Sequence, residues 1–248
     1  MKNILLMLFV CVVTNNAYAL STKNLPEISR LDSLLNAPDQ KEVDKRVKKQ
    51  GGVIRSGLAA SDKHRGTTAA EIAGLLSNGS ADAQKQFEDA FEQERQMIEK
   101  FLEQNNFAIN DMGVAYAFSF ISLWELAHDH ILPVEAELAA GKYMVHMFEE
   151  VKTEYALISD EEKDKAYDWF MATPIAFVGL YKSFKEEGAE QNAVDISKKS
   201  AQLFQEVFKF PHTYFTFSDK GEFGVNTDAL LDDARAKDTA KSSKKSDW

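Results

Sequence analysis

Apolar side chains recur at helical spacing along most of the chain between residues 82 and 208. In the first such segment, apolar residues lie on one side and glutamates on the other, and Asn105 and Asn106 end it. This two-sided pattern indicates a helix that packs one face against a core. The apolar positions are Phe87, Phe91, Met97, Ile98, Phe101 and Leu102.

The next segment differs, because every position from Met112 to Trp124 is apolar or small. A helix with no polar side is surrounded by other helices. Its 13 residues give about 20 Å of helix, which is too short for a bilayer core of about 30 Å. We therefore expect a central core helix. Asn110 is expected to be its N-cap, with Asp111 beside the positive end of the helix dipole.

Two further long helices are predicted after this central segment. Pro133 fits the first position of a helix whose apolar positions continue to Tyr155. Ser159 and Glu162 have the spacing of a capping box. The helix that they start contains Pro174, which we expect to kink it.

Residues 191–208 are predicted to form the last long helix, and residues 212–217 a short extended arm across the bundle. The predicted fold is therefore all-α, with a single bundle of about five long helices.

This helical domain occupies residues 80–217 of the predicted organisation. Residues 20–79 form a basic, glycine-rich and loosely structured segment, in which only residues 27–35 and 68–76 have helical patterns. Residues 218–248 form a polar and mostly disordered tail.

The first 19 residues have the pattern of a signal peptide. Lys2 precedes a ten-residue apolar run, and Ala17 and Ala19 are the small residues that a signal peptidase recognises. We expect cleavage after Ala19 and export to the periplasm or the extracellular medium. Cys11, the single cysteine, leaves with this segment. No transmembrane segment is predicted in the mature chain.

The charge of the chain is negative and unevenly placed. The formal net charge is −10, and residues 80–227 contain 13 basic and 27 acidic residues. An acidic helical region offers no basic face to nucleic acid or to an anionic membrane. A basic cluster lies at residues 41–49. It is either a solvated face or an electrostatic contact to the acidic bundle.

Candidate chemistry is sparse, and no cofactor is predicted. Glu125 and His128 have the Glu-x-x-His spacing that places both side chains on one helix face, as in di-iron bundles. Together with His130 they are candidate metal ligands or acid–base groups at the end of the core helix. The alternative is a polar helix end whose histidines face the negative end of the dipole. The sequence contains no serine elbow, zinc-protease motif or phosphate loop.

Two helix starts carry a resemblance to a known family. They are residues 110–115 (Asn-Asp-Met-Gly-Val-Ala) and residues 158–163 (Ile-Ser-Asp-Glu-Glu-Lys). Their order and spacing resemble an uncharacterised family of exported bacterial proteins, a domain of unknown function, over roughly residues 80–212. The resemblance implies an exported helical protein and supplies no catalytic residues.

The favoured function is a module that binds another protein, because an export signal accompanies an absence of catalytic motifs. Its docking surface would be the apolar faces at Phe184 or Phe208, or the arm that contains Tyr214, Phe215 and Phe217. The oligomeric state is not predicted.

Two other functions stay open. A metal-binding protein or enzyme would use the Glu125, His128 and His130 cluster. A carrier of an apolar small molecule would use a cavity around Trp124, Trp169 and Pro174.

Overall fold

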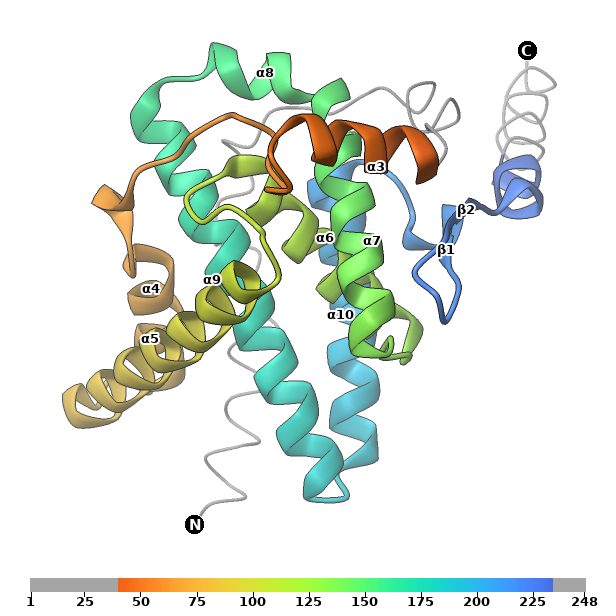
Figure 1. Cartoon of the computed structure of the whole chain (residues 1–248). Helices are drawn as coiled ribbons and strands as arrows, with labels where there is room; N and C mark the ends of the chain where they lie inside the picture. The colour runs from red at the N-terminus through yellow and green to blue at the C-terminus, as the bar shows by residue number, and fades with distance from the viewer. Residues whose placement is uncertain (1–39, 234–248) are drawn as a thin grey trace, which may run out of the picture.

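The computed structural model describes residues 40–233 (Figure 1). The predicted signal peptide with cleavage after Ala19, the helical pattern at residues 27–35 and the last part of the polar tail lie outside the described residues. The elements in chain order are α3 (Gln40–Lys49), η3 (Asp62–His64), α4 (Thr67–Leu76), α5 (Ala81–Gln104), α6 (Met112–His128), α7 (Val134–Met147), η4 (Phe148–Glu150), α8 (Lys152–Leu157), α9 (Asp160–Glu186), α10 (Glu190–Phe208), η5 (His212–Tyr214), β1 (Phe215–Phe217) and β2 (Phe223–Val225).

The described chain is mostly helical, as the hydrophobic pattern predicts, and it adds one small sheet. In this sheet β1 and β2 pair antiparallel, with Thr216 opposite Gly224. Of the extended arm predicted at residues 212–217, only residues 215–217 are a strand of this hairpin, and residues 212–214 form the 3₁₀ turn η5. None of the helices within residues 40–233 combines the length and apolarity needed to cross a membrane.

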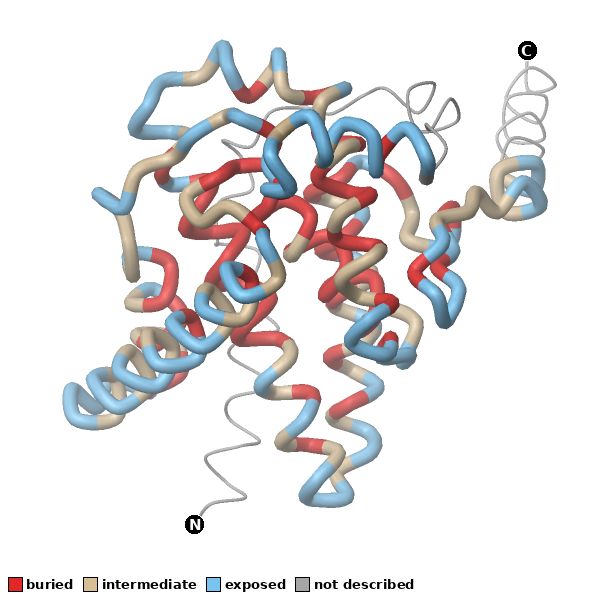
Figure 2. The backbone as a smooth tube through the Cα atoms, in the orientation of Figure 1, coloured by how far each residue is buried: buried red, intermediate tan, exposed pale blue. Residues whose placement is uncertain are grey.

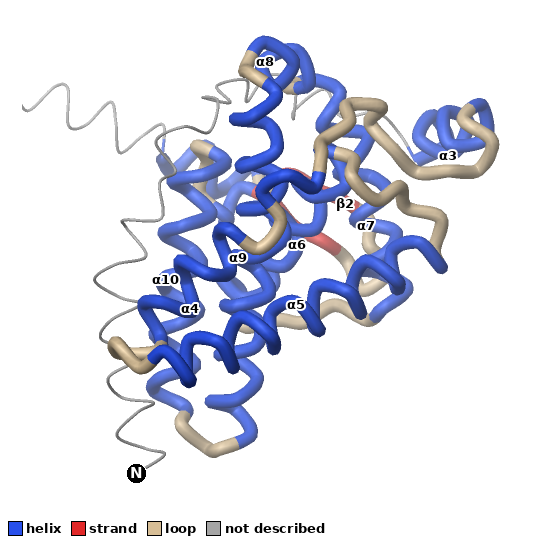
Figure 3. Tube along the Cα trace, turned by 90° about the vertical axis from the view of Figure 1, so that its left-hand side faces the viewer, coloured by secondary structure: helices blue, strands red, loops and turns tan. Residues whose placement is uncertain are grey.

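Helix α6 is the centre of the molecule. It contacts α7, α9 and α10, and it is buried from Met112 to Leu126 except at Phe118. Figure 2 shows this buried backbone at the middle of the fold, with exposed segments around it. On one side of this centre, α4 and α5 lie against α9 (Figure 3). The uniformly apolar segment is thus a core helix because it has helices on several sides.

The N-cap of α6 is Asp111, and the prediction of Asn110 as the cap is wrong. Asn110 has a φ of 60°, in the left-handed region. Asp111 has the extended backbone of an N-cap, and its carboxylate accepts hydrogen bonds from Gly113 N and Val114 N. Asn110 belongs to the turn that precedes the helix. Since an N-cap residue has an extended backbone, the cap lies one position later, at Asp111.

The capping box at the start of α9 is confirmed. The Ser159 hydroxyl accepts a hydrogen bond from Glu162 N, and the Glu162 carboxylate accepts one from Ser159 N. Pro174 lies inside α9, which continues to Glu186.

The helix predicted from Pro133 to Tyr155 is interrupted. Helix α7 ends at Met147, and a 3₁₀ turn separates it from the short α8. Phe148 in this turn and Tyr155 in α8 are both fully buried. Their rings lie 5.3 and 6.5 Å from that of Tyr116 in α6. The helix is therefore broken where these two side chains pack against α6. Such a contact between distant segments cannot be read from the periodicity of one segment.

The N-terminal segment is more ordered than its glycine content predicts. Helix α3 packs on α7 through the fully buried Val43, and an ion pair joins Asp44 to Lys142. The basic side chains of residues 41–49 are all exposed, so this cluster is a solvated face. Residues 54–66, here called the strap, lie between α3 and α4.

Candidate functional site

An apolar groove lies between α5, α6 and α7, and its volume is about 170 Å³. All of its lining residues are apolar or glycine except Glu137. They are Ile98, Phe101, Leu102, Phe107, Val114, Ala117, Phe118, Ile121, Glu137, Leu138 and Gly141. An apolar cavity of about 150 Å³ is enough to hold benzene. Drug-sized ligands occupy about 300–1,000 Å³, so this groove suits one small ring or a short chain.

Phe107 forms one wall of the groove because the strap holds the loop between α5 and α6. Ile54 N donates a hydrogen bond to Asn106 O at 2.8 Å, and Ala108 N donates one to Ile54 O at 2.9 Å. These bonds bracket Phe107, which is itself buried. The wall therefore depends on a contact between segments about fifty residues apart in the sequence.

The strap is fixed at the start of α6 by Asp111. The Asp111 carboxylate accepts hydrogen bonds from Ser56 N at 3.0 Å, Ser56 Oγ at 2.8 Å and Gly57 N at 2.8 Å, besides the two amides that it caps. Buried donors need partners. One carboxylate thus satisfies the first turn of the helix and the strap together.

Gly141 opens the groove between α6 and α7. A β-carbon at this position would lie 3.4 Å from Phe107 Cζ and 3.7 Å from Ile121 Cδ1. These are ordinary van der Waals distances, so a methyl group would fit there and occupy part of the groove.

Glu137 is the one charged side chain of the lining. It makes no hydrogen bond or ion pair with any described residue. Burial raises its pKa above the usual carboxyl range, and the positive charge of Lys182 acts in the opposite direction. Lys182 itself is exposed.

Glu125, one helical turn beyond Ile121 in α6, is a buried carboxyl group. Its Oε1 accepts a hydrogen bond from Leu132 N at 2.8 Å. Burial raises the pKa of Glu125 to about 8; the nearby charge of Glu137 adds to the rise, whereas the Leu132 hydrogen bond and the charge of Lys182 oppose it. Glu125 therefore holds the turn between α6 and α7, a role that the sequence did not suggest.

The other two sequence-predicted ligands have different partners. His128 Nδ1 lies 2.9 Å from Trp124 O, and burial lowers the pKa of its ring. His130 is half-exposed, with Nε2 3.6 Å from the Asp219 carboxylate. Within residues 40–233 no three His, Cys, Asp or Glu side chains are grouped so that they could hold a metal ion.

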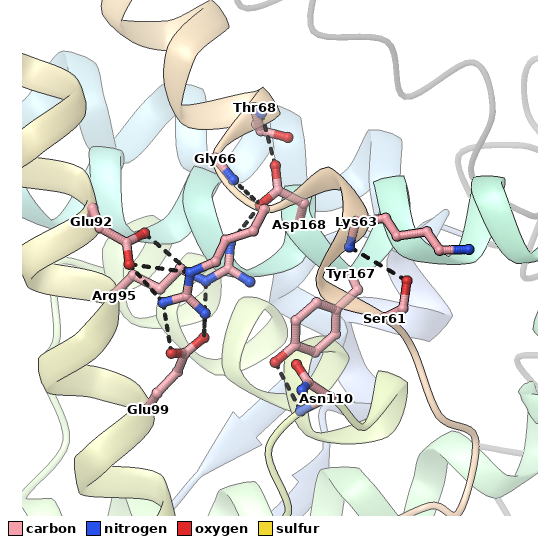
Figure 4. A network of polar contacts seen from close by, with 11 residues as sticks. Ser61, Lys63, Gly66, Thr68, Glu92, Arg95, Glu99, Asn110, Tyr167 and Asp168 are labelled. Atoms are coloured by element: carbon pink, nitrogen blue, oxygen red, sulfur yellow. Dashed lines mark hydrogen bonds and ion pairs between the residues drawn. The ribbon is translucent and has the colours of Figure 1, made fainter. Parts of the chain in front are cut away.

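A second group of polar side chains joins the strap to α5 and α9 (Figure 4). Asp168 accepts hydrogen bonds from Gly66 N at 3.0 Å and Thr68 N at 2.8 Å, at the start of α4, and from the buried guanidinium of Arg95. Arg95 also donates to Glu99 at 3.0 Å. Arg65 in the strap pairs with Glu92 and Glu99, at 2.9 Å each.

This polar group lies beside a hollow of about 230 Å³ that Glu88, Asp89, Glu92 and Arg95 help to line. Three of these four are acidic, and Nε and Nη1 of Arg95 already donate hydrogen bonds to carboxylates. We interpret the group as the anchor of the strap and of α4.

The surfaces expected to bind a protein partner are covered. Phe184, Phe208 and Phe215 are fully buried. Tyr214 and Phe217 are almost fully buried. Trp124, Trp169 and Pro174, around which a ligand cavity was expected, are also buried. Trp124 Nε1 donates to Phe215 O at 3.0 Å. The apolar groove described above lies on other residues.

The fold and site define a mostly helical protein with a small apolar groove that has one half-buried carboxyl group, Glu137, in its lining and a buried one, Glu125, nearby. Comparison with protein-family models, with curated proteins and with solved structures finds no match to any of them. The resemblance of residues 80–212 to an exported bacterial family therefore stays a prediction.

Sequence reasoning missed most of the groove. It placed Ile98, Phe101 and Leu138 on core-facing positions without distinguishing a groove from a filled core. One feature of the sequence did point to it: Glu137 is adjacent to Leu138 and lies within the apolar periodicity of its helix. An acidic residue at such a position is uncommon in a core.

Proposed function

We propose that this chain is an exported protein that binds a small, mainly apolar molecule in the groove between α5, α6 and α7. The observation that carries the proposal is the groove itself, with a continuous apolar lining and one charged side chain. Ligand sites are concave and apolar, with few polar groups that orient the ligand.

Export is part of the proposal and rests on the amino terminus of the sequence. Lys2, the apolar run over residues 4–13 and the alanines at 17 and 19 have the order of a cleavable signal. A protein-binding role draws less support, since the apolar faces that would carry it are buried.

Binding is tested with benzyl alcohol, a neutral probe of about the right size, followed by calorimetry and by thermal unfolding. We expect saturable binding and a rise in melting temperature. A ligand at a hundred times its Kd adds about 2.7 kcal/mol to the free energy of unfolding. Absence of both effects up to the solubility limit of the probe would remove the proposal.

A matched pair of variants locates the binding site. Gly141→Ala places a methyl group in the groove, and Gly179→Ala places one on an exposed part of α9 with nothing within 4 Å. Both changes favour the helix by about 1 kcal/mol. We expect Gly141→Ala alone to weaken binding, by roughly tenfold. Equal affinities for both variants would place the ligand elsewhere.

A further inference from the structure

The charge inside the groove identifies a class of ligand. Glu137 lies in the lining with ten uncharged residues around it, and no described residue forms a hydrogen bond or ion pair with it. Glu137 is half-buried, and partial loss of hydration makes its charge costly unless a partner compensates. The groove therefore combines an apolar contact surface with a carboxylate that no described residue pairs.

The surroundings of Glu137 are acidic. Glu125 is close enough for the Glu137 charge to raise its pKa, and Lys182 is the one cation among residues 40–233 that acts on both carboxyl groups. Lys182 is exposed to solvent, where its charge is well screened. Two carboxyl groups thus face one solvated amine. The whole chain is also acidic, with a formal net charge of −10.

We propose that the ligand of this groove is a small apolar amine, whose hydrocarbon part contacts Phe107 and Ile121 and whose ammonium group pairs with the carboxylate of Glu137. This inference rests on the proposed function of the groove. An ammonium group can donate hydrogen bonds to the Glu137 carboxylate and balance its charge. A carboxylate ligand would place a second negative charge beside Glu137.

The position of Glu137 in its helix agrees with this pairing. Glu137 lies in the first turn of α7, where the positive end of the helix dipole favours an ionised carboxylate. A cation in the groove would likewise favour the ionised form of the Glu137 carboxylate.

The test compares three probes with one ring and different head groups: benzylamine, benzyl alcohol and benzoate, each titrated by calorimetry at pH 7 and low ionic strength. We expect benzylamine to bind about tenfold more tightly than benzyl alcohol, and benzoate to bind most weakly. Equal affinities of benzylamine and benzyl alcohol would overturn the amine assignment and leave the proposed function in place. Failure of all three probes would overturn both.

A pair of variants assigns the effect to one side chain. Glu137→Gln keeps the shape of the side chain and removes its charge, whereas Glu135→Gln changes an exposed glutamate in the same turn. In Glu137→Gln we expect the ratio of the benzylamine affinity to the benzyl alcohol affinity to fall about tenfold. Glu135→Gln should leave the ratio of the two affinities as in the wild type. An unchanged ratio in Glu137→Gln would contradict the pairing.

Folding of Glu137→Gln is checked separately. Because the Glu137 side chain makes no hydrogen bond with a described residue, the variant should retain the wild-type melting temperature or exceed it. A lost preference for benzylamine in a folded variant then reports on the ligand contact.

Discussion

Glu125 is a carboxyl group buried in the core helix, and its protonation is coupled to folding. Its pKa is about 8 in the folded protein, against 4.5 for a free glutamate, chiefly because burial disfavours the charged form. Between these two values the folded state binds more protons than the unfolded state. The free energy of unfolding therefore falls as pH rises from about 4.5 to about 8, and this contribution is fully present below pH 4.5.

Replacing Glu125 by glutamine removes this pH dependence. Glutamine keeps an oxygen that can accept the hydrogen bond from Leu132 N. We expect Glu125→Gln to gain on the order of 2–4 kcal/mol relative to the wild type between pH 5 and pH 8. Urea denaturation of both proteins at the two pH values measures this difference.

The control for this experiment is Glu135→Gln, an exposed change that should follow the wild type at both pH values. Parallel pH dependences of Glu125→Gln and the wild type would show that Glu125 is not the group responsible.

At the scale of elements, the start of α6 depends on how closely the strap approaches it. A β-carbon on Gly113 would lie 2.5 Å from Ser56 Cβ and 3.1 Å from Phe148 Cδ1. Glycine is therefore required at Gly113 for close packing and not for an unusual backbone angle, since Gly113 is not among the residues with positive φ.

Two glycine-to-alanine changes in helices should consequently have opposite effects. Alanine is better than glycine in a helix by about 1 kcal/mol, so Gly179→Ala should raise the melting temperature. Gly113→Ala should lower the free energy of unfolding by about 1–3 kcal/mol, because the methyl group forces Ser56 away. Thermal unfolding followed by circular dichroism compares the two. A higher melting temperature for both would refute the close approach.

At the scale of the whole molecule, the C-terminal hairpin closes the aromatic core. The ring of Phe215 is 5.5 Å from that of Phe120 in α6 and 6.2 Å from that of Phe204 in α10. The backbone carbonyl of the same residue accepts the hydrogen bond of Trp124. A three-residue strand thus contacts both of these helices.

Truncation of this ring should cost much of the stability of the fold. We expect Phe215→Ala to lower the free energy of unfolding by about 3–5 kcal/mol, through lost burial and a cavity. Thr216→Ala, an exposed change in the same strand, should cost less than about 0.5 kcal/mol. Urea denaturation measures both.

If Phe215→Ala does not fold, Phe215→Leu supplies a smaller step. The decrease in the free energy of unfolding for Phe215→Leu should still exceed the decrease for Thr216→Ala. Equal losses in the two variants would mean that the hairpin is not part of the core.

Local patterns predicted the long helices well because their causes are local. The uniformly apolar α6, the capping box of α9 and the segment that became α10 all follow from spacing along the chain. The interruption between α7 and α8 did not follow, because Phe148 and Tyr155 pack on Tyr116, a residue more than thirty positions away in the sequence.

The sequence by itself determined the helical class of the protein and its central helix, since periodicity, capping and composition depend on neighbouring residues. Only the tertiary structure decided the cap at Asp111, the strap that holds Phe107, and the groove in which Glu137 is the one charge. A groove is the space left between side chains of separate helices, and the burial that raises the pKa of Glu125 comes from the packing of the whole fold. Neither quantity is a property of any one segment, so both appear only when the helices are assembled.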